Sequence, residues 1–439
     1  MRRSNRMREG RLARTMALFA LVASAAAVAA QEFALKDGET VVFYGDSITA
    51  QRFYTREAEE FVLTRYPRLH VRFVNAGVPG DTAAGGYAGK MAERVARDVA
   101  PWKPGMITVM LGMNDGGWGY GSADQIDADF QSRYRALLRA LRQAAPGVEL
   151  TLISSTPYDE VTHGTEFPGY AKMVDRLGGD VAQIAAQEQS AGGMPVLFAD
   201  FHEPMQDALE RAEARAPQLA ALLIPDRIHP GEAAQWVMAA ALMKAWHVDP
   251  AVSSVDLRAG DATVAGSDGA TVTGLKKTLD GLKWTQQDEA LPLPLDFNNA
   301  MTTLLLQVSD VGELDREMLR VEGQAPGEYE LRIDGEPVAT FSRDELEHGV
   351  NLALFKTPML EQSRDIASKE EERAGLDRAA FILSADVKRI ATAGAAETTL
   401  REAEDELDVE IRKEVMPGPH EFELRQLGPG AKKDAAQVN

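Results

Sequence analysis

Short apolar runs alternate with longer amphipathic segments between residues 39 and 246, and no other feature constrains the fold as strongly. Five runs have the length and composition of buried strands: 40–44, 70–75, 106–111, 149–154 and 195–200. Segments with a helical period lie between them, notably 53–66, 89–99, 128–145 and 170–189. Buried strands joined by helices are typical of a parallel sheet covered on both faces. The pattern predicts a flavodoxin-like three-layer α/β/α sandwich, with its ligand crevice at the carboxyl ends of the strands.

The sequence changes character after Trp246, where short β-branched runs separated by glycine and aspartate replace the long helical segments. Such runs are typical of a small β-rich domain. Residues 329–333 and 338–341 flank Asp334-Gly335, a pair that suits a type I′ turn, so this stretch predicts a β-hairpin. Residues 420–427 alternate like one further strand.

Residues 359–415 interrupt the β-rich part and are rich in Glu, Arg, Ala and Leu, with no proline. This composition predicts two long helices broken near 393–396, inserted into the β-rich domain as a hairpin arm. Apolar positions recur along the arm at Leu360, Ile366, Leu376, Leu383, Val387 and Ile390. Such a stripe needs burial, so we expect the arm to pack on its own chain or to pair two copies in a homo-oligomer. A lid over the crevice is a third interpretation.

Residues 1–30 have the layout of a secretory signal peptide, with six arginines before Met16 and an uncharged apolar run from there to Ala30. The run is short for a membrane span, and Val28 and Ala30 occupy the −3 and −1 positions of a cleavage site. We therefore expect an exported chain that is periplasmic or extracellular after cleavage. The alternative is a retained N-terminal anchor.

Composition limits the chemistry of the chain. It contains no cysteine, which excludes disulfides, thiol catalysis and thiolate metal sites. The 67 acidic against 47 basic residues give a net charge of −20, which disfavours nucleic acid and anionic lipid as partners. The length of 439 residues suggests two domains, which we place at 31–249 and 250–439, with the arm at about 359–415.

The first predicted strand ends in Gly45-Asp46-Ser47-Ile48-Thr49, which places a serine hydroxyl at the turn into the next helix. A serine there lies near a helix N-terminus, which favours developing negative charge. The motif alone is also ordinary turn and helix-capping chemistry. Three more segments follow in order: 75–82 with Gly80, 112–115 with Asn114, and 226–230 with Asp226 and His229.

With these four segments, residues 38–247 resemble the SGNH hydrolase (GDSL esterase) superfamily, whose four letters fall on Ser47, Gly80, Asn114 and His229. Ester cleavage needs a base for the attacking serine, and His229 is that group, with Asp226 three residues earlier to fix its tautomer. The resemblance assigns oxyanion stabilisation to the backbone N–H groups of Ser47 and Gly80 and to the Asn114 side chain. It implies no cofactor.

Other residues on this edge of the sheet have two interpretations each. Trp118 and Tyr158 line a substrate subsite or pack in the interior. Asp46 and Asp115 are expected to brace loops. His202 hints at a metal ligand, but no further ligand cluster accompanies it, so we expect it to belong to a helix cap and predict no metal site.

The sequence thus predicts an exported serine esterase that removes small acyl groups, with carbohydrate O-acetyl esters as the expected substrates. A lysophospholipase or thioesterase acting on lipids is the alternative within the enzymes. A binding or structural protein built on an SGNH scaffold is the alternative outside them. One fold hosts many specificities, so the resemblance does not choose the substrate.

Overall fold

The parallel sheet predicted for the N-terminal half is present in the computed structural model, which describes residues 32–386 and 392–428. Its strands lie in the order β2-β1-β5-β6-β7, and all neighbours run parallel. Their bounds are β1 (Thr40–Gly45), β2 (Arg72–Gly77), β5 (Met106–Met110), β6 (Glu149–Ile153) and β7 (Val196–Ala199). The chain moves from β1 outward to β2 and then crosses back to β5. A crevice is therefore expected at the carboxyl end of β1.

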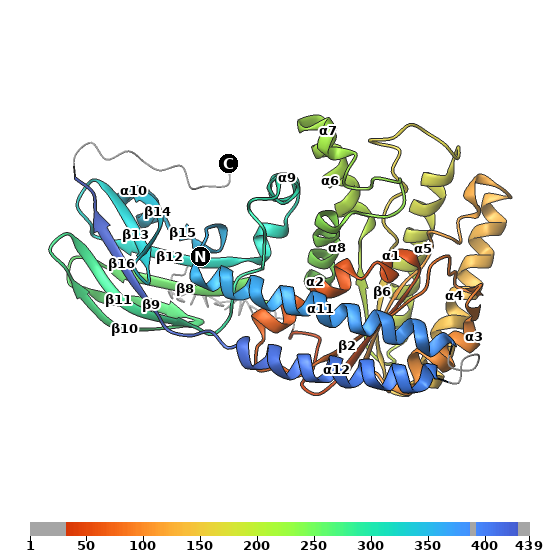
Figure 1. Cartoon of the computed structure of the whole chain (residues 1–439). Helices are drawn as coiled ribbons and strands as arrows, with labels where there is room; N and C mark the ends of the chain where they lie inside the picture. The colour runs from red at the N-terminus through yellow and green to blue at the C-terminus, as the bar shows by residue number, and fades with distance from the viewer. Residues whose placement is uncertain (1–31, 387–391, 429–439) are drawn as a thin grey trace, which may run out of the picture. The chain divides into compact units, whose positions relative to one another are not determined.

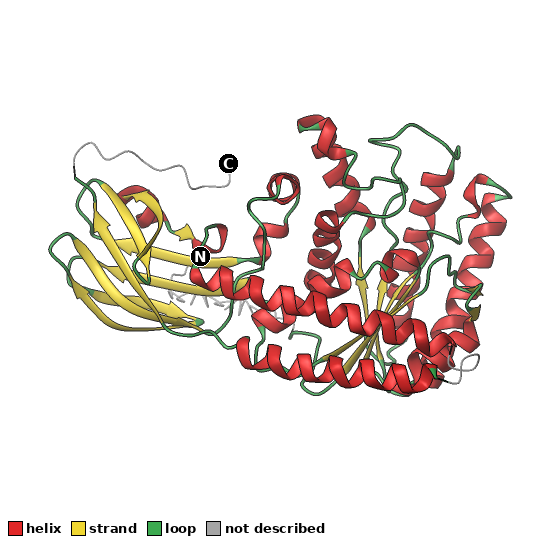
Figure 2. Ribbon diagram, viewed as in Figure 1, coloured by secondary structure: helices red, strands yellow, loops and turns green. Residues whose placement is uncertain are grey.

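Helices cover both faces of this sheet because successive strand side chains point to opposite sides (Figure 2). Val41 and Phe43 of β1 belong to one hydrophobic core, and Val42 and Tyr44 belong to the other. The first core is closed by α2 (Phe53–Arg65), α6 (His202–Arg215) and α8 (Glu232–Ala245), and the second by α4 (Ala123–Ala144) and α5 (Tyr170–Ser190). The three-layer α/β/α prediction is confirmed.

Short elements complete this part of the chain. They are α1 (Ser47–Ala50), β3 (Gly85–Gly86), β4 (Gly89–Lys90), α3 (Met91–Arg94), η1 (Val95–Val99), η2 (Ala100–Trp102), η3 (Gly117–Gly119) and α7 (Pro217–Ala220). The regular helix predicted over 89–99 is wrong in detail, since it begins only at Met91 and continues as the π-helical turn η1. Gly89 has a φ of +128°, which lies outside helical geometry. It pairs with Gly86 in a small hairpin instead.

Two further sheets face each other across a third hydrophobic core. One has the order β10-β11-β16-β13-β14 and the other β15-β12-β8-β9. The strands are β8 (Ala251–Arg258), β9 (Thr263–Asp268), β10 (Ala270–Lys277), β11 (Gly281–Asp288), β12 (Arg316–Glu322), β13 (Glu328–Ile333), β14 (Glu336–Ser342), β15 (Val350–Asn351) and β16 (His420–Gln426). They are connected in part by α9 (Ala300–Val308), η4 (Val311–Leu314), α10 (Arg343–His348) and η5 (Leu352–Leu354). The predicted β-rich part is therefore a two-sheet sandwich.

The predicted hairpin and the last strand lie next to each other in one sheet. Asp334 and Gly335 both have positive φ, at 51° and 86°, as the type I′ turn between β13 and β14 requires. Strand β16 then pairs with β13 on its other side. Two segments about ninety residues apart thus become neighbours, which places the intervening helices as an insertion, as predicted.

The inserted arm consists of α11 (Pro358–Asp386) and α12 (Ala393–Glu414), which lie side by side (Figure 1). The break comes earlier than predicted, because α12 already begins at Ala393; Val387 and Ile390 of the predicted stripe lie outside the described residues. Leu360 and Ile366 are fully buried within the chain, so part of the stripe needs no second subunit. Pairing of two copies through the arm stays a prediction.

The arm is attached to α2 through buried ion pairs. Arg373 of α11 is 5% exposed and contacts three carboxylates: those of Glu59 on α2, Glu370 on α11 and Glu404 on α12. Arg412 of α12 donates to the carbonyls of Leu69 and Val71 at 3.2 and 3.1 Å. These contacts hold the arm against the α/β part instead of leaving it to project.

Two sequence predictions lie beyond this description. The signal segment, with its expected cleavage after Ala30, falls in residues 1–31, outside the described range. The boundary after residue 249 stays a prediction, because the described chain from Phe33 onward forms one compact unit. Among the described helices, none is long and apolar enough to cross a membrane.

Replacing Arg373 should test whether the arm depends on its buried ion pairs. Arg373→Met leaves three buried carboxylates without their common cation, and such a loss costs about 3–5 kcal/mol. We expect a clear fall in thermal unfolding temperature. The matched control is Lys369→Met on the same helix, which removes an exposed pair with Glu414 and should change the temperature far less. Equal shifts in the two variants would contradict this account.

Candidate active site

The four sequence segments meet at the carboxyl edge of the parallel sheet. Ser47 is the first residue of α1, directly after β1, and Gly80 lies in the loop after β2. Asn114 follows β5, and His229 lies in the loop before α8. Parallel strands end at the same edge, which is why residues 182 positions apart, Ser47 and His229, come within hydrogen-bond distance.

An unbroken hydrogen-bond chain links Ser47, His229 and Asp226. The His229 Nε2 atom lies 2.8 Å from Ser47 Oγ, and its Nδ1 atom lies 2.7 Å from Asp226 Oδ2. The His229 side chain is 28% exposed, so a substrate can reach it. Burial raises the pKa of Asp226, but the hydrogen bonds from His229 and Ile228 outweigh it and hold that pKa below its usual range. The carboxylate therefore stays ionised beside the imidazole.

The loop that carries this pair has a strained backbone. Arg227 adopts a left-handed φ of 73°, which costs a non-glycine residue about 1 kcal/mol. The turn lets Asp226 Oδ1 accept the N–H groups of Ile228 and His229 at 3.0 and 2.7 Å, which leaves Oδ2 for the imidazole. Asp159 N–H donates to the Arg227 carbonyl at 2.9 Å and fixes the loop from outside.

Gly80 and Asn114 are held to each other through Asp81. Gly80 has a φ of +74°, where a side chain would be strained. Asn114 Nδ2 donates to the backbone carbonyl of Asp81 at 3.0 Å, and Asp115 Oδ1 accepts the N–H of Ala83 at 3.1 Å. The amide of Asn114 has a second N–H to offer, so it can stabilise an oxyanion while it stays anchored. The expectation that Asp115 braces a loop agrees with this contact.

A buried charge cluster lies behind these loops. Arg94 is fully buried, pairs with Asp81 and with Asp98, and sits 4.5 Å from the centre of the Tyr44 ring. Burial raises the pKa of Asp46 to about 7, and it does the same for Asp115. Sequence reasoning missed Arg94, because nothing in its helical segment signals that it is buried.

The candidate site opens into a cleft of about 740 Å³. The residues that line it come from the α/β part and from α11: Ser47, Ala50, Gln51, Arg52, Phe53, Gly77, Val78, Pro79, Tyr87, Ala88, Arg97, Asp226, His229, Arg378, Phe381 and Ile382. Tyr87 is 78% exposed at the turn between β3 and β4. The sequence offered a signal for Tyr87, because it is an aromatic residue next to two glycines. The α11 residues Arg378, Phe381 and Ile382 had no such signal, since only the tertiary fold brings them to the cleft.

Trp118 and Tyr158 are not among the described residues that line this cleft. They pack with Tyr170 instead: Trp118 stacks on it at 4.7 Å between ring centres, and Tyr158 meets it edge-on at 5.0 Å. Tyr158 is only 2% exposed. The packing interpretation therefore describes both side chains as they lie here, and a substrate contact for either stays a prediction.

His202 begins α6, and Asp200 Oδ1 accepts its N–H at 2.9 Å in a helix-capping arrangement. This agrees with the capping interpretation. No group of three or more metal-ligating side chains occurs among the described residues.

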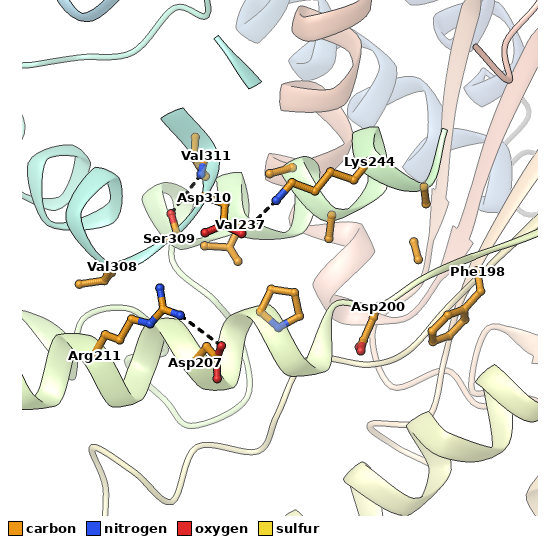
Figure 3. A pocket seen from close by; sticks show the side chains of 15 residues that line it. Phe198, Asp200, Asp207, Arg211, Val237, Lys244, Val308, Ser309, Asp310 and Val311 are labelled. Carbon is orange, nitrogen blue, oxygen red and sulfur yellow. Dashed lines mark hydrogen bonds and ion pairs between the residues drawn. The ribbon is translucent and has the colours of Figure 1, made fainter. Parts of the chain in front are cut away.

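A second cavity of about 280 Å³ lies between β7, α6, α8 and η4 and shares no lining residue with the cleft (Figure 3). Both of its cations are paired, Lys244 with Asp310 at 3.1 Å and Arg211 with Asp207 at 3.4 Å (Figure 3). It holds neither a candidate nucleophile beside a base nor a histidine. The cleft at Ser47 is therefore the candidate active site.

The chain is similar to known proteins in sequence and in fold. Residues 43–237 match the model of the GDSL-like lipase/acylhydrolase family. The structure of a gut microbial diltiazem-metabolizing enzyme is similar over 90% of this chain and 98% of its own, with 24% identity and a TM-score of 0.74. An acetylxylan esterase from Geobacillus stearothermophilus matches 49% of this chain and 97% of its own, with 25% identity and a TM-score of 0.38. No curated protein matches the sequence significantly.

The match over residues 43–237 covers every segment that meets at Ser47, and the similarity to the diltiazem-metabolizing enzyme extends the shared fold to the sandwich and the arm. Residues 43–237 therefore form a GDSL-like lipase/acylhydrolase domain of the SGNH hydrolase superfamily, and the chain is a serine ester hydrolase.

Proposed function

We propose that Ser47, His229 and Asp226 form the catalytic triad of this hydrolase. The observation that carries the proposal is the continuous hydrogen-bond chain from Ser47 Oγ through both imidazole nitrogens to the Asp226 carboxylate. In such a chain the base is already oriented toward the proton that it must take. The role of Asp226 is to hold the tautomer that leaves Nε2 free and to stabilise the imidazolium that forms.

The reaction follows from these positions. Ser47 Oγ attacks the ester carbonyl carbon as its proton passes to His229 Nε2. The backbone N–H groups of Ser47 and Gly80 and the Asn114 amide stabilise the oxyanion that results. Collapse of this intermediate expels the alcohol, which takes its proton from His229, and leaves an acyl group on Ser47. Water activated by His229 then releases the acid and restores the serine.

We further propose that the acyl group is small, with O-acetyl esters of carbohydrates as the substrates. A cleft of about 740 Å³ is far larger than an acetyl group, so most of the ligand volume belongs to the alcohol part or to a long acyl chain. Arg52, Arg97 and Arg378 line this volume. Arg52 is buried, but Arg97 and Arg378 keep part of their surface in solvent. An alkyl chain packed against these two guanidinium groups would remove water from them at a cost, whereas a hydroxylated alcohol would not.

A lipid-directed lysophospholipase or thioesterase is the second candidate. Phe53, Tyr87, Phe381 and Ile382 give the cleft an apolar component against which an alkyl chain could pack. A binding protein on this scaffold is a third, and it predicts no turnover. The export of the chain, proposed from residues 1–30, is compatible with all three.

Ser47→Ala and His229→Ala should each reduce kcat for an acetyl ester by on the order of 10⁴-fold or more, because the two groups act as one unit. The double variant should then be little worse than either single variant. Steady-state kinetics with para-nitrophenyl acetate measures this, with circular dichroism as the control for folding. Multiplicative losses in the double variant would contradict the pairing.

Asn114→Ala should lower kcat by about 10²- to 10³-fold, the loss expected for one oxyanion donor. KM should change little, since the donor acts mainly on the transition state. Because Asn114 also anchors the Asp81 carbonyl, Asn114→Asp is a useful companion: it keeps the size of the side chain but removes the donor. A loss confined to KM would make Asn114 a binding residue instead.

A panel of esters distinguishes the three functions. The wild-type chain and Ser47→Ala are compared on para-nitrophenyl esters of increasing acyl length and on acetylated xylooligosaccharides. We expect kcat/KM to fall as the acyl chain lengthens and acetate to be released from the oligosaccharides. A kcat/KM that rises toward long acyl chains would favour the lipid hydrolase. Absence of turnover on every ester would favour the binding protein.

A further inference from the structure

The catalytic cleft is lined in part by α11, which reaches it from the inserted arm. Arg378, Phe381 and Ile382 line the same volume as Ser47 and His229. Arg378 and Ile382 are four residues apart and therefore share one face of the helix. Ile382 is 55% exposed, so its side chain is accessible from the cleft that it lines.

Buried contacts hold this stretch of α11 in a fixed position. Asp377, next to Arg378, is 3% exposed and pairs with Arg52 and with Arg401. Burial raises the pKa of Asp377, but the two guanidinium groups outweigh it and hold that pKa below its usual value. Phe381, one turn later, packs against the core that contains β1 and α4. The side chains that face the cleft thus project from an anchored backbone.

The arginines of the cleft differ in how their charge is satisfied. Arg52 pairs with Asp377, and Arg97 pairs with Asp98 and donates to the carbonyl of Ala88 at 2.8 Å. Asp226, the acid in the lining, is engaged by His229. Within the described part of the chain, Arg378 has no ion-pair partner, and it is exposed to the cleft. The cleft therefore offers one cation that a ligand can neutralise.

We propose that α11 forms the alcohol-binding subsite of this hydrolase and that Arg378 binds a carboxylate on the alcohol part of the ester, while Phe381 and Ile382 pack on its apolar face. The inference rests on the proposed function and narrows its substrate class to acyl esters of an acid-bearing alcohol, such as a sugar acid. Arginine suits this role because its planar fork matches a carboxylate.

The acidic surface of the chain does not prevent this binding. The net charge of −20 acts at long range, and salt screens charges in solution beyond about 8 Å at physiological ionic strength. Arg378 would act by direct contact inside the cleft, where screening is weaker. The excess of acid slows the approach of long polyanions, so a short ester is the expected ligand.

Two acetyl esters that share one aromatic alcohol skeleton test the proposal: para-acetoxybenzoate, which carries a carboxylate, and its methyl ester, which is neutral and one methyl group larger. The measurement is kcat/KM for each ester with the wild-type chain and with Arg378→Gln. We expect the ratio of anionic to neutral kcat/KM to fall about tenfold in Arg378→Gln, the effect of losing one charge-assisted hydrogen bond. The neutral ester is the internal reference, because any loss of kcat/KM common to both esters cancels in the ratio.

Lys369→Gln is the matched control, because it removes one positive charge from the same helix at a residue that does not line the cleft. Its ratio should equal that of the wild type. An unchanged ratio in Arg378→Gln, or an equal fall in Lys369→Gln, would overturn the carboxylate subsite.

Phe381→Ala tests the apolar half of the subsite, and it should lower kcat/KM for both aromatic esters while sparing ethyl acetate. Equal losses on all three esters would overturn this half. Failure of the catalytic proposal is recognised separately, since Ser47→Ala would then retain wild-type turnover of the neutral ester.

Discussion

The buried guanidinium of Arg52 joins the inserted arm to the candidate catalytic loops. It is 8% exposed, pairs with Asp377 of α11 and lies 3.4 Å from the carbonyl of Asn75 at the end of β2. Asn75 in turn donates to the carbonyl of Thr49 at 2.7 Å and accepts the N–H of Gly77 at 3.0 Å. The helix that begins at Ser47 and the loop that leads to Gly80 are thus tied to one residue of the arm. A buried charge of this kind is costly unless it is paired, so arm and catalytic edge stabilise each other.

Arg94 is a second buried cation, and its ion pairs fix the loop that contains Gly80 from the other side. It pairs with Asp81, whose backbone carbonyl accepts from Asn114, and with Asp98. Oxyanion donors are effective only when they are oriented before the reaction begins, because reorientation during the reaction would consume the stabilisation that they offer. If Gly80 and Asn114 are the oxyanion donors, as proposed, the fixed ion pairs behind them would supply such preorganisation. The active edge therefore lies between two arginines that do not themselves take part in the proposed bond-breaking steps.

How much the sequence predicted depends on the range of the interactions involved. The five strands, the hairpin at Asp334-Gly335 and the two long helices depend on local periodicity and turn chemistry, and all were found close to their predicted positions. Ser47, Gly80, Asn114 and His229 were predicted because each lies in a short motif at the end of a strand or start of a helix. Trp118 and Tyr158 show the limit, since the same loop position suits a substrate contact or the stacking on Tyr170 that the structure has.

The sequence by itself determined the parallel sheet, the order of the candidate catalytic segments along the chain, and the existence of an inserted helical pair. Each of these features depends on how apolar residues, glycines and candidate catalytic residues are spaced within some tens of residues. Only the tertiary structure decided where the arm lies, and hence that Arg378, Phe381 and Ile382 line the cleft. The reason is that a helix with charged and apolar residues on several faces has more than one surface on which it could pack. The arm packs on the surface that carries Glu59 and Arg52, because these two residues form buried ion pairs with Arg373 and Asp377 of the arm. Each pair joins residues more than three hundred positions apart in the sequence.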